Sequence, residues 1–528
     1  MDDVIETLRK NRTLLIVLAV LLLLFLMAVQ GMSTRDWAIT LLRSFAVGAV
    51  TFLVASGMSL ILGLMDVLNL AHGTLFMIGA YVGWSVYVRP DTFVDLLAPL
   101  ALLAAGFVLK PLWDNLIGRL SLPPGVTRTW PWVGLILAGA ILLLALPRFP
   151  IAIWDPEVYN DSPIVWTQGF ELGQTSSLVE PARFKGASSI AGLGGVLLGS
   201  ALAAASLSGF ARHRGVLGRP STGRLPWSTL VPFVVLAAAG MAAYLANDVL
   251  TGFLFGLDTT WLFLIAVVVA TLVGGLLGGL MEATLIRPLY ARPLYQIMLT
   301  LGLGFIGTEV VRAIWGRSGF TMPRPSLFAG SGEGCPATGP GEWFAHRCST
   351  LAVSIQGEVT RIRVYNEVFV ILVGLIVFVA VWILIQRSRL GMIIRAGVQD
   401  SEMVEALGIN VRQVFMLVFA LGTALAALGG VLSGPSTGLS DAMGESLLLG
   451  GLIALAIGGM TSFAGAAAGS LLVGLLQQFV IKYGQIGINL PFLDGPFKPS
   501  PTLVPAATVL LMVIILVLMP QGLLGRKE

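Results

Sequence analysis

Long apolar stretches recur along the whole chain, and their length restricts what it can fold into. A helix that crosses a bilayer needs about 20 mostly apolar residues, and the sequence offers about 14 segments close to this length. Their approximate bounds are 14–30, 44–64, 72–88, 93–109, 132–147, 190–207, 229–246, 261–281, 297–315, 367–386, 413–433, 446–460, 464–481 and 503–519. The segments at 132–147 and 446–460 are short, so we expect them to be re-entrant or broken helices.

The composition supports a protein that lies in a membrane. Hydrophobic residues make up 56% of the 528 residues and charged residues only 11%, whereas soluble domains average about 25% charged residues. A soluble fold of this size would have too few charges to cover its surface. No period-2 strand pattern accompanies the apolar runs, which argues against a closed β-barrel. We therefore predict an all-α integral membrane protein, a polytopic bundle of about 14 transmembrane helices.

Glycines spaced four residues apart indicate where these helices pack closely. Glycine lets two helix backbones approach each other where lipid gives no hydrophobic drive for association. Five pairs have this spacing: Gly79/Gly83, Gly195/Gly199, Gly274/Gly278, Gly275/Gly279 and Gly465/Gly469.

The distribution of positive charge predicts the orientation of the helices. Arg9, Lys10 and Arg12 precede the first apolar run, and basic residues accumulate in short cytoplasmic segments of membrane proteins. An N-terminus in the cytoplasm, followed by alternating spans, places most of the short basic segments inside. The same count of spans brings the C-terminus to the cytoplasm as well.

The first apolar run allows two interpretations. The stretch 14–29 could be the apolar part of a cleaved signal peptide, but Gln30 is not a small residue and Asp2 and Asp3 make the start acidic. We favour a retained anchor within residues 1–43. A cleaved signal remains the alternative and leaves the rest of the topology unchanged.

Two long connections fall outside in this topology, at about 148–188 and 316–365. The second contains Cys335 and Cys348, the only cysteines of the chain. Because the space outside a bacterial inner membrane is oxidising, we expect a disulfide between them. Two free thiols are the alternative.

Patterns of soluble enzymes occur in the wrong context. The G-x-G-x-x-G pattern at Gly302–Gly307 lies inside an apolar run, where it predicts helix packing, and the G-x-S-x-G pattern at Gly434–Gly438 follows a membrane helix. The chain has no P-loop and no cluster of metal ligands in its sequence. We therefore expect no catalytic residues, no metal site and no cofactor bound by this chain, so it is not predicted to be an enzyme.

Three motif-bearing segments distinguish the chain from other membrane proteins. They are Gly57–Gly73 with Met77–Tyr81, then Ile286–Leu294 with Leu299–Gly302, and finally Arg389–Ile409. Together they resemble the LivH-type permease family of ABC importers for branched-chain amino acids, which also includes permeases for urea and short amides. The resemblance covers about 44–88 and 260–525.

The resemblance implies a core like that of type II ABC importers in the bacterial inner membrane. It also implies several partners: a second related permease, two ATPase subunits that use the ATP, a periplasmic solute-binding protein and the lipid bilayer, with no nucleic acid. The chain is longer than a usual member. We therefore expect an anchor or signal at 1–43, a first core part at 44–92, an inserted helical membrane segment at 93–259 and a second core part at 260–528. The insertion could be a docking surface, a lipid-facing buttress or a regulatory module.

The segment 387–412 is charged and is predicted to face the cytoplasm. The resemblance makes it the coupling loop that docks into the ATPase, and a solvated loop is the alternative. Its candidate residues are Arg389, Gly391, Arg395, Asp400, Glu402, Ala406 and Gly408. Gly408 can end a short helix before the next span.

Polar residues within apolar stretches are candidates for the translocation path. Intramembrane polar groups are costly, so a function is the first explanation. The candidates are Asp66, Asn69, His72, Gly73, Thr300 and Glu309. Asp66 and Asn69 could instead cap a helix at the cytoplasmic interface, and Glu309 lies one helical turn from Arg312, with which it can pair.

We therefore predict a permease subunit of an ATP-driven importer that moves a small polar solute by alternating access. Branched-chain amino acids, urea and short amides remain open as solutes. The alternative is an ion-gradient-driven secondary transporter or channel that works without an ATPase, with Asp66, Glu309 and His72 as ion or proton sites. A membrane-embedded enzyme is disfavoured because no catalytic set is found.

Overall fold

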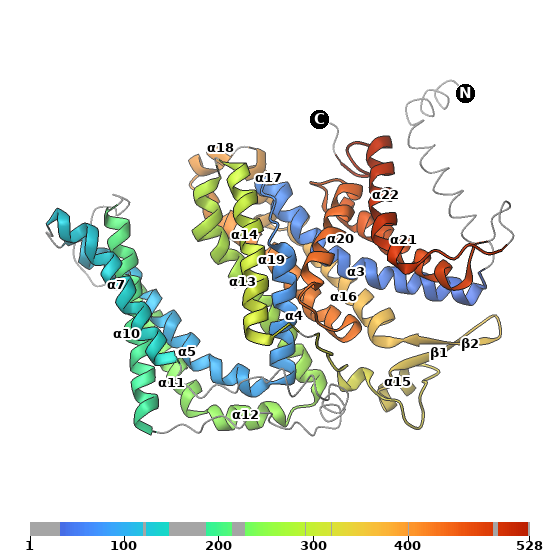
Figure 1. The fold of residues 1–528 in the computed structure, drawn as a ribbon, viewed down its shortest axis with the longest axis horizontal. Coiled ribbons are helices and arrows are strands. Elements are labelled where there is room, and N and C mark those ends of the chain that lie inside the picture. Colours follow the sequence, from blue (N-terminus) through green and yellow to red (C-terminus); the bar gives the residue numbers. More distant parts are fainter. Residues whose placement is uncertain are drawn as a thin grey trace. The chain divides into compact units, whose positions relative to one another are not determined.

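The computed structural model describes residues 32–119, 123–146, 186–213, 227–290, 292–317, 319–399, 401–488 and 495–525. They divide into two compact units, which are described separately (Figure 1). Unit 1 contains the described residues up to Trp84 and from Thr259 onwards, and unit 2 contains those from Ser85 to Asp258.

Unit 1 consists mainly of long helices, with one small hairpin. Its elements are α3 (Thr34–Met65), α4 (His72–Val88, which continues into unit 2), α13 (Thr259–Met281), η2 (Glu282–Ile286), η3 (Arg287–Leu289), α14 (Pro293–Trp315), η4 (Ser326–Phe328), α15 (Pro340–His346), β1 (Thr350–Ile355), β2 (Glu358–Arg363), η5 (Tyr365–Phe369), α16 (Val370–Arg387), α17 (Arg389–Gln399), α18 (Ser401–Ala406), α19 (Val411–Thr437), α20 (Met443–Gly458), α21 (Phe463–Ile486), η6 (Pro501–Leu503) and α22 (Val504–Leu518). The β1–β2 hairpin lies at one end of this unit and α17 and α18 at the other (Figure 1). We call these the hairpin end and the α17 end.

Unit 2 is a smaller helical bundle. Its helices are α5 (Pro90–Val108), α6 (Lys110–Arg119), α7 (Pro124–Ala145), α10 (Gly186–His213), α11 (Trp227–Leu245) and α12 (Asn247–Phe255). Helix α10 packs against α5, α6 and α7, and α11 packs against α5. The core contains Leu102, Leu193 and Val196. Unit 2 covers most of the segment that we expect to be an insertion, and this assignment stays a prediction.

The predicted fold class is confirmed. Within the described residues, 10 helices are long and apolar enough to cross a bilayer, or up to 11 if the bent pair α11 and α12 forms one span. The sequence suggests more because the run at 14–30 lies outside the described residues, and because α4 and α20 have only 17 and 16 residues. The expectation of a short helix at 132–147 is wrong, since α7 begins earlier, at Pro124, and has 22 residues.

Helix α3 is the central helix of unit 1. It packs against α16, α19, α20 and α21, and an unbroken series of its residues from Thr51 to Ile61 is buried. Two glycines make the closest approach possible. A Cβ on Gly57 would collide with the carbonyl oxygen of Gly422 in α19, and a Cβ on Gly422 would lie 2.7 Å from the carbonyl oxygen of Gly57. The α3 and α19 backbones therefore touch directly.

The glycine pairs predicted from the sequence lie at helix contacts. Gly274 and Gly278 of α13 face Ala427 and Thr423 of α19, with too little space for a side chain. Gly469 of α21 lies against the carbonyl oxygen of Ala454 in α20. We expected the G-x-G-x-x-G pattern in α14 to serve helix packing, and this is wrong for its first glycine. Gly302 has no neighbouring heavy atom within 4 Å of a Cβ built on it, so it does not serve helix packing in unit 1.

The long connection that follows α14 is organised around the two cysteines. Cys335 and Cys348 form a disulfide. Strands β1 and β2 pair antiparallel, with Thr350 opposite Arg363 and Ile355 opposite Glu358. Hydrogen bonds from the backbone N–H and hydroxyl of Thr338, at 2.8 and 2.7 Å, hold Glu342 at the start of α15. They also lower the pKa of the Glu342 carboxyl.

We expect Gly469→Ala to destabilise the protein because the new methyl group must separate α20 from α21. Overpacking of this kind costs about 1–3 kcal/mol. Thermal unfolding of the detergent-solubilised protein should show a lower Tm for Gly469→Ala. The matched control is Gly302→Ala in α14, which adds the same methyl group to open space and should leave the Tm unchanged or raise it slightly. An equal Tm for both variants would contradict the packing argument.

The disulfide can be tested without ambiguity because the chain has only 2 cysteines. We expect a maleimide to label no thiol when the protein is denatured without reductant, and to label both cysteines after reduction. Denaturation is needed because Cys348 is buried. Mass spectrometry reads the result, and labelling before reduction would show that the cysteines are unpaired.

Candidate functional site

The chain breaks between α3 and α4, where several candidate path residues lie. Asp66 ends α3 in the left-handed conformation, with φ 52°, and its side chain is exposed. Asn69 is buried and accepts a hydrogen bond through Oδ1 from the backbone N–H of Ala71, at 3.1 Å. His72 is fully buried, with Nε2 3.2 Å from the carbonyl oxygen of Val54. These contacts shape the turn between the two helices.

Two other candidates connect this break to neighbouring helices. Thr300 of α14 is fully buried, and its hydroxyl accepts a hydrogen bond from the backbone N–H of Leu70 at 3.2 Å. Gly73 lies so close to the carbonyl oxygen of Gly444 in α20 that a side chain could not fit. The structure therefore brings Asn69, His72, Gly73 and Thr300 into one region around the start of α4.

Glu309 lies elsewhere, at the surface near the hairpin end. Its side chain is 61% exposed and is paired with Arg312 at 2.5 Å, as its position one turn away predicts. Arg312 also contacts Asp441, with Nε 2.8 Å from Oδ2. This pair of contacts joins α14 to the connection between α19 and α20.

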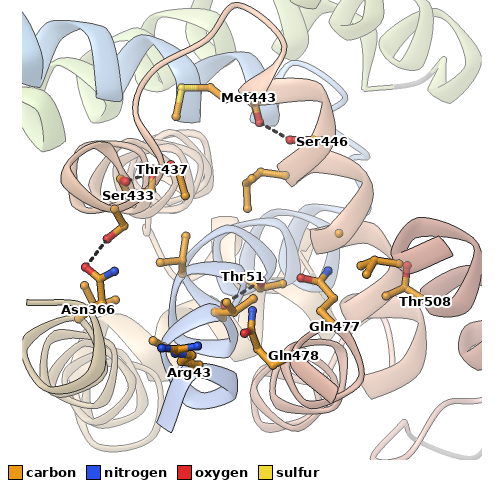
Figure 2. A pocket seen from close by; sticks show the side chains of 18 of the residues that line it. Arg43, Thr51, Asn366, Ser433, Thr437, Met443, Ser446, Gln477, Gln478 and Thr508 are labelled. Atoms are coloured by element: carbon orange, nitrogen blue, oxygen red, sulfur yellow. Dashed lines mark hydrogen bonds between the residues drawn. The ribbon is translucent and has the colours of Figure 1, made fainter. Parts of the chain in front are cut away.

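A cavity of about 690 Å³ opens among the helices of unit 1. Its walls come from α3, η5 with the start of α16, the end of α19, the first part of α20, α21 and the start of α22. Figure 2 shows the side chains that surround it. None of the six candidate path residues is among those that line it. Their assignment to the path stays a prediction.

The cavity has a mixed lining. Hydroxyl and amide groups line it from several helices, and they include Thr51, Ser446, Gln477, Gln478 and Thr508 (Figure 2). Aliphatic side chains such as those of Val47, Val50 and Ile453 complete the walls. Pockets that bind small molecules combine an apolar lining with a few placed polar groups, and their volumes are about 300–1,000 Å³. The cavity can therefore hold a small solute that is partly polar and partly apolar.

A buried carboxylate lies in the wall of this cavity. The side chain of Glu367 is 1% exposed. Its Oε1 accepts a hydrogen bond from Nε of Arg43 at 3.0 Å, and its Oε2 accepts one from the backbone N–H of Arg363 at 2.7 Å. The Arg363 guanidinium adds an ion pair at 3.5 Å. Glu367 sits in the π-helical turn η5, a rare conformation that is often found at functional sites.

The predicted coupling segment forms two short helices at the α17 end. Gly391 lies against the carbonyl oxygens of Leu384 and Ile385, where a Cβ would collide, and its N–H donates to the Ser388 hydroxyl at 2.9 Å. The Arg395 guanidinium donates to the carbonyl oxygen of Ile385. These contacts fold α17 back against the end of α16.

The remaining coupling candidates lie on the surface. Arg389, Ala406 and Gly408 are exposed, and Gly408 has φ 82°, which is the left-handed conformation expected where a helix ends. Asp400 lies outside the described residues, and so does the side chain of Glu402. Helix α17 packs against α3, α16 and α19, and α18 packs against α17 and α19.

A second buried carboxylate, which we did not predict, lies close to this segment. Glu282 is fully buried in the π-helical turn η2. Its oxygens accept hydrogen bonds from Nη2 of Arg287 at 2.8 Å and from the Tyr290 hydroxyl at 2.5 Å. Burial raises the pKa of Tyr290, so its hydroxyl stays protonated and donates. Arg287 also reaches the carbonyl oxygen of Arg412 at 3.4 Å.

Only an indirect signal in the sequence points to these two carboxylates. Residues five apart, such as Glu282 and Arg287, do not share a face of an α-helix, because that geometry brings residues three or four apart together. The π-helical turn changes the spacing and lets them meet. Arg43 and Glu367 are far apart in the sequence and only the packing of α3 against η5 joins them. Among the described residues, no group of three or more His, Cys, Asp or Glu side chains is arranged to hold a metal ion.

Residues 40–168 and 182–520 match the family described as "Branched-chain amino acid transport system / permease component". The high-affinity branched-chain amino acid transport system permease protein LivH of Salmonella typhimurium (strain LT2) is 25% identical over 344 residues, which cover 63% of this chain and 94% of LivH. LivH of Escherichia coli (strain K12) is 26% identical over the same shares. The permease protein BraD of Pseudomonas aeruginosa is 30% identical over 165 residues, 31% of this chain and 49% of BraD. No solved structure matches significantly.

The family match extends over the helices of both units, and it contains the cavity, the buried carboxylates and the three motif-bearing segments. The protein therefore belongs to the family of permease components of branched-chain amino acid transport systems.

Proposed function

We propose that this chain is the permease subunit of an ATP-driven importer and that its solute passes through the cavity of unit 1 by alternating access. The observation that carries the proposal is the polar lining of this cavity, which lies among helices apolar enough to span a membrane. Polar side chains are expensive within a bilayer and usually face a water-filled passage.

The mixed lining supports a solute with polar ends and apolar surface. The printed names of LivH and BraD assign them to branched-chain amino acid transport. Such amino acids carry charged groups and an aliphatic side chain, so they match both kinds of wall. Urea and short amides, the other solutes that the sequence resemblance leaves open, match only the polar wall.

The α17 end supports docking of an ATPase. Exposed apolar side chains gather on α17, α18 and the residue that follows them, at Met392, Met403 and Leu407, which are 61%, 64% and 75% exposed. An exposed apolar patch with charged neighbours such as Arg389 is typical of a protein interface. We propose that α17 and α18 receive the ATPase.

The helices that α17 contacts also line the cavity, so movement at this interface can be transmitted to it. Helix α17 packs against α3, α16 and α19, and the same three helices provide cavity walls through Arg43, Val370 and Ser433. Arg287 adds a second connection, because it links the turn after α13 to the first residues of α19. A displacement of α17 would therefore act on several walls of the cavity together.

The proposed assembly contains a second related permease, two ATPases and a periplasmic solute-binding protein, in a bacterial inner membrane. We place the α17 end and both termini in the cytoplasm and the hairpin end in the periplasm. The disulfide at the hairpin end supports this orientation, since disulfides persist in oxidising compartments. ATP is used by the ATPase subunits. We assign residues 93–259 to an inserted membrane segment.

A transporter driven by an ion gradient gains no specific support from the cavity. Among the described residues, the only carboxylate in its lining is Glu367, which is paired with two arginines. A proton or cation site would need a carboxylate that is available to the ion.

Reconstitution tests the proposed function directly. We expect proteoliposomes that contain the permease, its ATPase partners and the cognate binding protein to take up leucine only when ATP is supplied on the ATPase side. Radiolabelled uptake is the measurement. Uptake by the permease alone, driven by an imposed ion gradient, would support the secondary transporter instead.

The docking surface is tested by Leu407→Glu. A docked ATPase would bury the new charge without a partner, and an unpaired charge in an interface costs several kcal/mol. We therefore expect co-purification of the ATPase and ATP-dependent uptake to fall by about tenfold or more. The control is Phe344→Glu, which places the same charge on an exposed apolar residue near the hairpin. Loss of ATPase co-purification in Phe344→Glu, or its retention in Leu407→Glu, would remove this surface from the proposal.

A further inference from the structure

We propose that Arg43 binds the carboxylate of the solute in the cavity, and that it thereby selects amino acids over urea and neutral amides. This inference rests on the proposed function, because it assigns the cavity to the transported solute. It adds a residue and a reason for selectivity that neither the fold nor the family match provides.

The geometry leaves the outer edge of the Arg43 guanidinium available. Its Nε donates to Glu367 at 3.0 Å, and Nη1 and Nη2 make no hydrogen bond to the described part of the chain. The side chain is 43% exposed and belongs to the cavity lining. Figure 2 shows Arg43 among the side chains around the cavity. An arginine presents its two Nη groups as a planar fork that fits a carboxylate.

Glu367 holds this guanidinium in place. The carboxylate is buried in the η5 turn. Its Oε2 accepts a hydrogen bond from the backbone N–H of Arg363, and the Arg363 guanidinium lies 3.5 Å from Oε1. An arginine whose Nε is already bonded loses less freedom when a ligand binds its Nη edge. Glu367 is therefore a positioning residue for Arg43.

The balance of charge favours an anionic group. The charged residues in the cavity lining are Arg43, Arg363 and Glu367, so the wall has one excess positive charge. A further ion pair joins Lys482 of α21 to Asp36 of α3 at 2.6 Å. Neither residue lines the cavity. Interactions between charges strengthen where protein replaces water, so the excess charge acts on a solute in the cavity more strongly than it would in solution.

The rest of the lining matches the remaining parts of an amino acid. The amide oxygens of Gln477 and Gln478 can accept hydrogen bonds from an ammonium group. Val47, Val50 and Ile453 offer an aliphatic wall for the side chain. Urea and short amides are neutral and have little apolar surface, so they gain neither the charge interaction with Arg43 nor the apolar contact.

The test is solute protection of one cysteine placed in the cavity of the full chain. Ser446 is exposed and lines the cavity, and the native cysteines are paired, so Ser446→Cys supplies the only reactive thiol. The rate of labelling by neutral N-ethylmaleimide is measured against increasing leucine, leucinamide or urea. Leucinamide differs from leucine only in having a neutral amide in place of the carboxylate.

We expect half-protection at a concentration about tenfold or more lower for leucine than for leucinamide, since a hydrogen bond to a charged group contributes about this factor or more. Arg43→Gln should bring the two concentrations together. Arg43→Lys, which can keep an ion pair with Glu367, should retain part of the difference. Urea should protect equally weakly with and without Arg43.

The matched control is Lys482→Gln. It removes the ion pair between α21 and Asp36 of α3, which lies outside the cavity lining. This variant should keep the preference for leucine over leucinamide. The inference is overturned by equal protection by leucine and leucinamide, by an unchanged preference in Arg43→Gln, or by the absence of protection by any solute. A preference that is lost equally in Lys482→Gln would also overturn it, because the effect would then be structural.

The uptake assay separates this inference from the proposed function. If uptake depends on ATP but the preference for leucine over leucinamide does not depend on Arg43, the proposed importer function stands and the proposed role of Arg43 is wrong. The reverse result, an Arg43-dependent preference without ATP-dependent uptake, would keep the binding site and remove the importer.

Discussion

Direct contact between helix backbones is the constraint on which the rest of unit 1 depends. In a bilayer, helices gain little from burying apolar side chains against one another, so close packing must hold them together. Gly57 and Gly422 bring α3 against α19, and Gly73 brings α4 against α20 at Gly444. Of these helices, α3, α19 and α20 contribute residues to the cavity lining. Any side chain at these positions would move the cavity walls apart.

Two buried glutamates form ion pairs with arginine inside unit 1. Each lies in a π-helical turn and is held by arginine: Glu282 after α13, and Glu367 before α16. A buried carboxylate without a partner is strongly destabilising, so each glutamate requires its arginine to stay in place. Glu282 organises the region next to the coupling segment, and Glu367 organises the cavity wall. Both regions are thus held by the same kind of interaction, and at Glu367 this interaction places the guanidinium of Arg43 in the cavity lining.

Sequence reasoning grouped the residues of the predicted coupling segment and of the close helix contacts better than those of the cavity. Arg389, Gly391 and Arg395 belong to a continuous segment, so their neighbourhood follows from their order in the chain. The cavity is built from residues that are hundreds of positions apart, and hydroxyl and amide side chains such as Thr51 and Gln477 give no distinctive pattern. Glu367 was also missed, because one carboxylate at the start of an apolar run resembles any residue at a membrane interface.

The amino-acid sequence by itself determined that this chain is a bundle of membrane-spanning helices, because the length and frequency of apolar runs leave the backbone no other way to satisfy its hydrogen bonds within a bilayer. It also determined where many helices touch, through glycine spacing. Only the tertiary structure decided which polar side chains share a cavity and which arginine meets which glutamate. The reason is that helix spacing reports neighbours within about one or two turns, whereas the choice among distant helices depends on how all of their surfaces fit together.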